Sequence, residues 1–240
     1  MDIRGMHYDF KQKLNKVDSQ QYRNLRVPEI DWKLNEALEI FIKSIAEPRV
    51  TNHLGFEKNQ RTIDDIRTLV INDESLQPAK TPDGINYYVG IPFDYMFYLS
   101  ASMTISKSGC GDKQATAILQ RHDDRHEESP FNKSSYEWGE VSIRFYENGI
   151  KIFTDGTFTI SKFSLNYIKK HAYIHAAEDF LPGKTYNLPD GSPLTKTQNC
   201  ELPGHTHREI VDIAVLITTG ELQIPDYQIK QNKLNLNQIN

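Results

Sequence analysis

Hydrophobic residues recur at helical spacing near both ends of the chain and alternate with polar residues in the middle. Near the N-terminal end, the pattern predicts a helix from Pro28 to Glu47-Pro48, because proline suits a first helical position and stops a helix further along. Glu29 and Asp31 suit the positive end of this helix's dipole. Its apolar face is formed by Ile30, Leu34, Ala37, Leu38, Phe41, Ile42 and Ile45.

Two shorter helices are expected in the same part of the chain. Phe10, Leu14 and Val17 share helical spacing, so a short helix before residue 26 would need a partner to dock against. A second pattern runs from about Arg61 to Asn72 and predicts another helix. The stretch Ser75–Gly84 contains two prolines and ends in a turn signal, which indicates a loop.

The segment THREIVDIAVLITTG, residues 206–220, carries apolar residues around most of a helix perimeter. Thr206 and Glu209 have the spacing of a capping box, and Gly220 is placed to supply a left-handed stop. A helix that is apolar nearly all round needs cover on several sides. It is therefore either a central core helix or a helix shared with a neighbouring subunit.

Trp32 and Ile40 project away from the apolar face of the first strong helix, which indicates a second contact surface. Together with the over-apolar C-terminal helix, they suggest a set of candidate subunit-interface residues. The set consists of Trp32, Ile40, Phe41, Val211, Val215 and Leu216.

From Ile85 onward the hydrophobic period changes from helical to alternating. Strands are predicted over Tyr87–Ile91, Tyr95–Ile105 and Gln114–Gln120. The last two strands would pair across the loop 107–113. Because this loop lacks a following helix and a third glycine, its G-x-G fragment is better explained as a connection between antiparallel strands than as a nucleotide loop.

The alternation around Val141–Phe145 predicts a further strand, and Asn148-Gly149 predicts a type I′ hairpin turn after it. That turn would pair Phe145 with Ile152 and Arg144 with Phe153. A second turn at Asp155-Gly156 leads into TFTISKF, so we expect a three-stranded meander.

The order of these elements predicts an α+β fold, in which helices from both ends form one layer and an antiparallel β region containing the meander is inserted between them. The expected division is a helical layer from residues 1–80 plus 203–225, a β region at 84–175, a loop at 176–202 and a polar tail at 226–240.

Composition narrows the class of protein. The 240 residues are 38% hydrophobic and 25% charged, which is typical of a folded chain of one or two domains. A net charge of −4 argues against sequence-independent binding of nucleic acid. No apolar run reaches the roughly 18 residues of a membrane span, and the start lacks an apolar signal region, so we expect a soluble protein without a membrane partner. Cys110 and Cys200 are expected to be free thiols in a reducing compartment.

Two clusters contain metal-ligand residue types. Cys200, His205 and His207 have a C-x4-H-x-H spacing that is not a standard zinc pattern and provides only three ligands. The run RHDDRHEES offers His122, Asp123, Asp124 and His126, but dense charge after a strand usually marks a solvated loop. A metal-dependent hydrolase that uses either cluster remains an alternative function.

No serine or cysteine lies in a nucleophile-elbow context, and no carboxylate pair stands out as lining a cleft. We therefore expect no enzymatic activity, no catalytic residue and no cofactor. A second alternative function is a β module that binds carbohydrate through exposed tyrosines and Trp138.

Four segments, spread along the whole chain but covering well under half of it, resemble a structural protein of crAss-like bacteriophages, the short-tailed phages of gut Bacteroidales. They are RVPEIDWKLNEALEIFIK with AEPR (26–49), GFEKNQRTIDDIRTLVI (55–71), PFNKSSYEWGEVSIRF (130–145) and CELPGHTHREIVDIAV (200–215).

The resemblance implies a virion protein of the head-to-tail connector, of the ring or adaptor type, with no catalytic residues. From the residues themselves we expect no metal site. Such proteins form rings, commonly of about twelve copies, that stack below the portal. The implied partners are copies of the chain itself, the portal and neighbouring tail rings, with DNA only in transit. The implied location is the tail or neck of the virion, after assembly in the cytoplasm of the bacterial host. Loops 107–113 and 121–135 would offer docking surface to the next ring.

Overall fold

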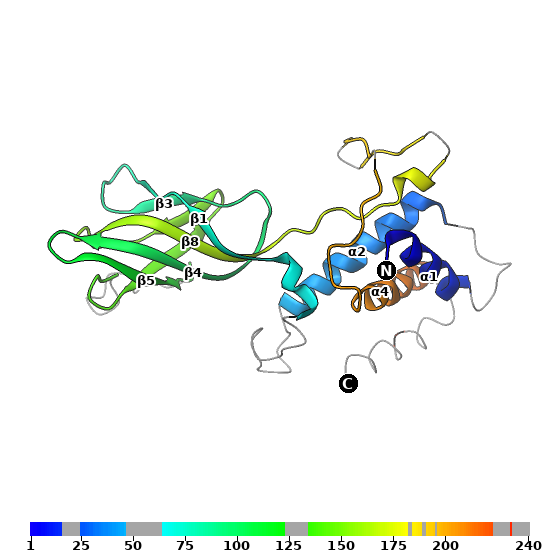
Figure 1. Ribbon diagram of the computed structural model, residues 1–240, viewed down its shortest axis with the longest axis horizontal. Helices are drawn as coiled ribbons and strands as arrows, with labels where there is room; N and C mark the ends of the chain where they lie inside the picture. The colour runs from blue at the N-terminus through cyan, green and yellow to red at the C-terminus, as the bar shows by residue number, and fades with distance from the viewer. Residues whose placement is uncertain are drawn as a thin grey trace. The chain divides into compact units, whose positions relative to one another are not determined.

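The computed structural model describes residues 1–15, 25–46, 64–122, 134–181, 184–188, 191–194, 196–222 and 231. The chain forms two compact units. The helical unit comprises Met1–Leu69 and His171–Asn240, and the β unit, Val70–Lys170, is inserted between those two parts. The fold is therefore α+β, as the order of the patterns predicted (Figure 1).

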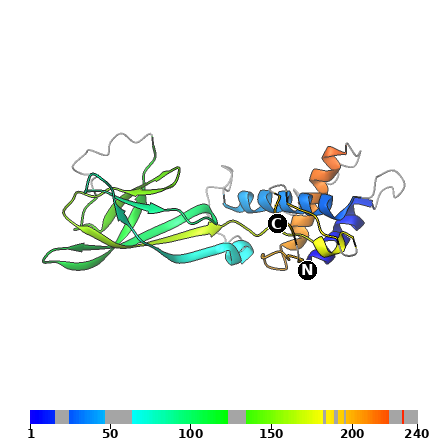
Figure 2. The same cartoon turned by 90° about the horizontal axis from the view of Figure 1, so that it is seen from above.

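Within the described residues, the main helices of the helical unit are α1 (Ile3–Asn15), α2 (Val27–Ala46) and α4 (His207–Glu221). Helix α4 packs against both α1 and α2, and Figures 1 and 2 show these helices gathered in one layer. Phe10 and Leu14 are buried on α1, which confirms the short N-terminal helix, while Val17 lies outside the described residues. The predicted apolar face of α2 is buried from Ile30 to Ile42.

Helix α4 begins after Thr206, as predicted, but neither of its predicted end signals operates. The Thr206 hydroxyl makes no cap to the helix and instead donates to the carbonyl of Pro203 at 2.9 Å. Gly220 remains within the helix without a positive φ, and Leu222 is the C-cap. Gly220 and Leu222 are both exposed, so burial does not explain why the helix continues past the glycine.

The predicted helix at residues 61–72 is wrong in its second half. Residues 64–66 are helical, Arg67–Leu69 form a 3-10 turn, and strand β1 (Val70–Leu76) starts immediately afterwards. The short strand β2 (Ala79–Lys80) then occupies part of the predicted loop. The chain leaves the helical unit at Leu69, because Val70 pairs with Ile168 in the sheet.

The β unit contains one eight-stranded sheet in the order β1-β8-β4-β5-β6-β7-β3-β2. Its neighbours are antiparallel except for β5 and β6, which run parallel. The remaining strands are β3 (Tyr87–Gly90), β4 (Tyr95–Lys107), β5 (Gly111–Leu119), β6 (Glu140–Tyr146), β7 (Gly149–Ile152) and β8 (Thr159–Lys169).

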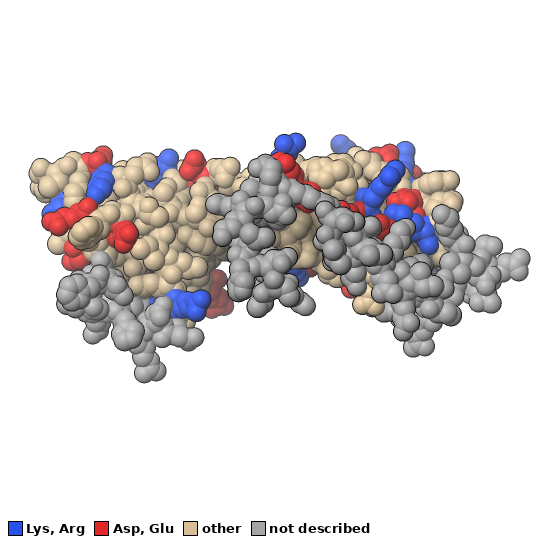
Figure 3. Space-filling model, turned by 90° about the horizontal axis from the view of Figure 1, so that it is seen from below, with Lys and Arg blue, Asp and Glu red and all other residues tan. Residues whose placement is uncertain are grey.

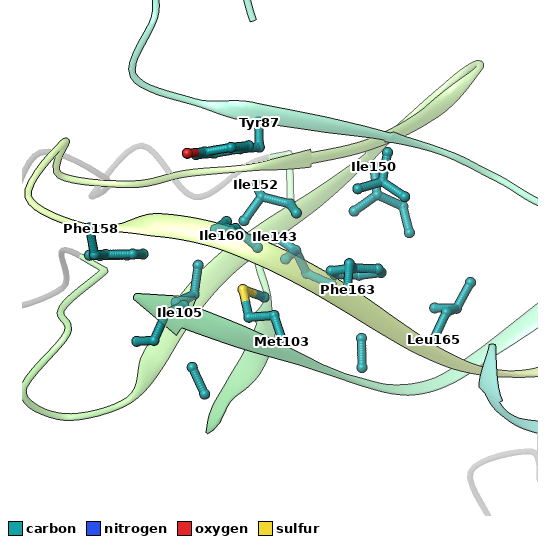
Figure 4. Packing of buried hydrophobic residues seen from close by; sticks show 14 of the residues in the cluster. Tyr87, Met103, Ile105, Ile143, Ile150, Ile152, Phe158, Ile160, Phe163 and Leu165 are labelled. Carbon is teal, nitrogen blue, oxygen red and sulfur yellow. The ribbon is translucent and has the colours of Figure 1, made fainter. Parts of the chain in front are cut away.

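The sheet is rolled up. Strands β1 and β2 form its two edges, yet only Gln77 and Pro78 separate them in sequence. Leu76 and Ala79 therefore lie within about 10 Å of each other, which brings the two edges together at this point. Side chains from β3 to β8 fill the roll, among them Met103, Ile143 and Phe163 (Figure 4). Eight strands enclose just enough space for such a packed interior.

The strands over 87–91, 95–105 and 114–120 are confirmed, and so is the turn between β4 and β5. The three-stranded meander is wrong. Strand β7 pairs with β6 and β3, whereas β8 pairs with β4 and β1. At 11 residues, β8 runs along most of the 13-residue β4 and gains more ladder bonds there than beside the four-residue β7.

The β6–β7 turn is also displaced from its predicted position. Glu147 and Asn148 form the turn, and the register pairs Phe145 with Ile150 and Arg144 with Lys151. Neither Asn148 nor Gly149 has a positive φ, so the turn is not type I′.

The segment 176–202 is more structured than the predicted loop. It contains the 3-10 turn η4 (Ala177–Asp179) and isolated bridges such as the one between His175 and Gln198.

Candidate functional site

The outer face of α2 exposes two large apolar side chains. Trp32 is 51% exposed and Ile40 is 44% exposed, as the off-face positions predicted. Ion pairs surround them: the Lys33 ammonium lies 3.0 Å from a Glu36 carboxylate oxygen, and Lys43 lies 3.2 Å from Glu39. Lys33 also pairs with Glu221 at the end of α4. Glu36 lies on the same face of the helix between Trp32 and Ile40, so the surface consists of two separate apolar side chains with charged residues between them.

The other candidate interface residues are not on that surface. Phe41, Val211 and Val215 are buried inside the helical unit of a single chain, and Leu216 is half-buried. Of the two alternatives for α4, a core helix or a helix shared with a neighbouring subunit, the structure supports the core helix, because α1 and α2 cover its apolar sides. The exposed part of the candidate interface is reduced to Trp32, Ile40 and part of Leu216.

Beneath the same helix lies a buried polar cluster that the sequence analysis missed. Asp31 is completely buried, and its carboxylate meets His7 Nε2 of α1 at 2.6 Å. The backbone N–H of Ala176 donates to both carboxylate oxygens, at 3.2 and 3.3 Å, and the Tyr186 hydroxyl donates to one of them. One carboxylate thus holds together three separate parts of the helical unit.

Asn35 extends this cluster by one helical turn. Its amide nitrogen donates to the carbonyls of Asp31 and Ile174, both at 2.7 Å, and its amide oxygen accepts from the Ile174 N–H at 2.9 Å. The exchange with Ile174 imitates one rung of a β-ladder, so it fixes the chain that returns from the β unit against α2.

The environment of the cluster shifts three pKa values. Burial raises the pKa of Tyr173 to about 12, with a further contribution from the nearby Asp31 charge. Burial and the hydrogen bond to Asp31 both raise the pKa of Tyr186. Burial lowers the pKa of His175, against the opposing pull of Asp31 and Glu178. The two tyrosines therefore stay protonated at neutral pH.

A carboxylate, an imidazole and a phenol in contact could act in proton transfer. Here Asp31 is fully buried, and His7 and His175 are each less than a tenth exposed, so the carboxylate and both imidazoles are shielded from solvent. The cluster is structural. Around the helix, position 31 falls between the apolar positions 38 and 42, and a polar residue inside an apolar stripe was the signal that could have revealed it.

Neither proposed metal cluster is assembled in the described part of the chain. His205 Nε2 lies 2.7 Å from Asp65, while His207 Nε2 lies 2.8 Å from the Leu202 carbonyl. Burial raises the pKa of the Cys200 thiol, which disfavours the thiolate that binds metal. Of the second cluster, only His122 is described, and its ring contacts Tyr146 edge-on. No group of three ligand-type residues in the described ranges could hold a metal ion.

In the β unit, the loop at 107–113 supports a second projecting indole. Gly109 and Gly111 both adopt a φ of 82°, and the turn packs against residues 134–139. Trp138 lies in this segment, 134–139, and is 81% exposed. Residues 123–133 of the proposed docking loop 121–135 lie outside the described residues.

Charges of both signs are interspersed over the face in Figure 3, without a continuous basic area among the described residues. No described helix has the length and apolar character to cross a membrane. No protein-family model matches the chain, and no curated protein matches it either.

Proposed function

We propose that this chain is a non-enzymatic structural subunit that assembles with copies of itself into a ring in the neck or tail of a short-tailed bacteriophage. The observation that carries this proposal is the outward-facing pair Trp32 and Ile40 on α2, a helix whose opposite face is already buried. Exposed tryptophan side chains are enriched at subunit contacts relative to the rest of a protein surface.

The division of the chain into a helical unit and a β unit supports the same proposal. A ring subunit touches neighbours on two sides, so it needs a rigid body with separate surfaces. The helical unit provides a rigid layer, since Asp31 and Asn35 lock its parts together. The β unit provides loops for the portal or the next ring. A net charge of −4 suits a channel through which DNA slides without binding.

The test is self-association of the full chain and of a Trp32→Ala/Ile40→Ala variant, measured by native mass spectrometry and sedimentation. We expect the unaltered chain to form closed oligomers and the variant to remain monomeric with an unchanged circular dichroism spectrum. Tyr8→Ala is the matched control, because Tyr8 is an exposed aromatic residue on α1 outside the proposed contact.

Connector subunits can require a portal template, so the same variants are also followed into phage particles. A chain that is strictly monomeric in solution and missing from purified virions contradicts the proposal. If the Trp32→Ala/Ile40→Ala variant still forms the oligomer, Trp32 and Ile40 are not the subunit contact.

A further inference from the structure

Trp138 is the most exposed tryptophan of the chain, and its backbone is held firmly. Residues 135 and 140 form a bridge, with the Ser135 N–H donating to the Glu140 carbonyl at 3.1 Å. The Gly139 N–H donates to the Ser135 carbonyl at 3.2 Å, and the Gly139 carbonyl accepts from Thr116 on β5 at 2.8 Å. The loop is therefore fixed on both sides of the indole.

The β4–β5 turn clamps the loop from a second direction. The Tyr136 hydroxyl lies 3.2 and 3.0 Å from the carbonyls of Cys110 and Gly111. The Lys113 ammonium donates to the Glu137 carbonyl at 2.7 Å. The ammonium groups of Lys113 and Lys107 also make cation–π contacts with the Tyr136 ring. Gly139 is needed here, because its φ of 66° is rarely adopted by other residues. The half-buried Tyr136 side chain therefore holds the loop in place.

A fixed loop that holds an indole in water presents a binding platform without an ordering cost on binding. The chemistry beside Trp138 selects the ligand. Its exposed neighbours Glu137 and Glu140 are carboxylates, and the adjoining turn carries Asp112. Apolar protein anchors lie among further apolar side chains, whereas the described residues 134–140 provide no second exposed one. Carboxylates accept hydrogen bonds from hydroxyl groups and repel anions.

We propose that Trp138 is the stacking platform of a carbohydrate site for a neutral sugar, whose C–H face covers the indole while its hydroxyls donate to Glu137 and Glu140. This inference does not depend on ring assembly, because the site belongs wholly to the β unit. The two carboxylates that flank Trp138 in sequence favour a neutral sugar over an acidic one, while the ammonium groups of Lys107 and Lys113 lie at the neighbouring Tyr136 ring.

The chain has only two tryptophans, so Trp32→Phe leaves Trp138 as the sole indole and makes its fluorescence a direct report of the site. The probes are cellohexaose, chitohexaose and mannohexaose, with polygalacturonate as the anionic counterpart. We expect at least one neutral hexasaccharide to shift the emission of the full-length variant, and polygalacturonate to leave it unchanged.

Calorimetry with the responding sugar then compares variants of the otherwise natural chain. Trp138→Ala should weaken binding by up to about tenfold, since stacking on one aromatic ring contributes as much as about 1.5 kcal/mol. Glu137→Gln/Glu140→Gln should weaken it less. Phe93→Ala is the matched control, because Phe93 is fully exposed at the opposite end of the rolled sheet.

Three results overturn the proposal. They are the absence of any response to the neutral sugars, an equal loss of affinity in the Phe93 and Trp138 variants, and a preference for polygalacturonate. If Trp138→Ala instead abolishes self-association without any sugar effect, the indole is a protein anchor and the carbohydrate assignment is wrong.

Discussion

At the scale of single residues, the buried Asp31 connects several segments of the helical unit. Its carboxylate is fully buried, and the groups around it belong to α1, α2 and the chain that returns from the β unit. Burying a carboxylate costs free energy unless hydrogen bonds and charge compensate it. The His7 imidazole, the Ala176 N–H and the Tyr186 hydroxyl provide that compensation, so each depends on Asp31 in turn.

We predict that Asp31→Leu destabilises the helical unit by about 3–5 kcal/mol, because it leaves the buried His7 and Ala176 groups and the half-buried Tyr186 hydroxyl without their acceptor. Tyr186→Phe removes one donor and should cost only about 1–3 kcal/mol. Urea unfolding followed by far-ultraviolet circular dichroism measures both. Glu39→Gln on the exposed side of α2 is the control, with an expected change below about 0.5 kcal/mol. Similar losses in the Asp31 and Glu39 variants would refute the structural role of the cluster.

A second residue-scale prediction concerns pH and His175. Burial lowers its pKa in the folded state, and its Nδ1 accepts the Ala177 N–H at 3.4 Å, which requires the neutral ring. The unfolded chain therefore binds the proton more readily, with a pKa near about 6.5. The stabilising contribution is present above that pH and is lost as the pH falls through the folded-state pKa.

The measurement is the urea midpoint between pH 7.5 and pH 5, for the unaltered chain and for His175→Gln. We expect the variant to have a flatter pH dependence, because the titrating ring is gone while the other ionisable groups remain. An unchanged slope would show that the loss of stability comes from those other groups.

At the scale of elements, the sequence predicted whether a segment is a helix or a strand better than it predicted which other segments it packs or pairs with. Periodicity identified α1, α2, α4 and most strands, because it reports which face of an element is buried. It cannot report what covers that face. Val211 and Val215 therefore could not be assigned to core or interface until α1 and α2 were seen to enclose them. The exposed pair Trp32 and Ile40 was predictable, since both lie off the apolar stripe of one helix.

The β6–β7 hairpin shows why local signals can mislead. Asn148-Gly149 has the sequence of a type I′ turn, yet Gly149 lies in strand β7 opposite Gly90. A β-carbon on Gly149 would collide with the ring of Tyr88 and the carbonyl of Val89. The glycine is therefore required for a close strand approach, and no single-strand pattern records such a contact between distant segments.

This contrast gives a prediction with a built-in control. Gly149→Ala should destabilise the β unit by about 1–3 kcal/mol, because Tyr88 or the β3 backbone must move. Gly90→Ala, on the partner position of the same ladder, should have a small effect, since a β-carbon there meets no atom within 4 Å. Thermal unfolding followed by near-ultraviolet circular dichroism separates the two variants. Equal losses would show that the close approach at Gly149 does not limit the packing.

At the scale of the whole molecule, the β unit is an insertion whose two ends meet. Val70 pairs with Ile168 at the start of β1 and the end of β8, so the chain enters and leaves this unit through neighbouring strands. Paired Cα atoms of antiparallel strands lie about 5 Å apart. Each unit has its own hydrophobic core: the interior of the rolled sheet in one, and the faces between α1, α2 and α4 in the other.

We therefore predict that the two units fold independently. Replacing residues 70–170 by a short Gly-Ser linker should leave a helical unit that unfolds cooperatively and keeps the Asp31 cluster, because Leu69 and His171 need only a few residues to join them. The excised β unit should retain its near-ultraviolet circular dichroism, which reports the packing of its tyrosines. In the shortened chain, Asp31→Leu should cost as much stability as in the full chain. A helical unit that loses cooperative unfolding would instead show that its core depends on the inserted sheet.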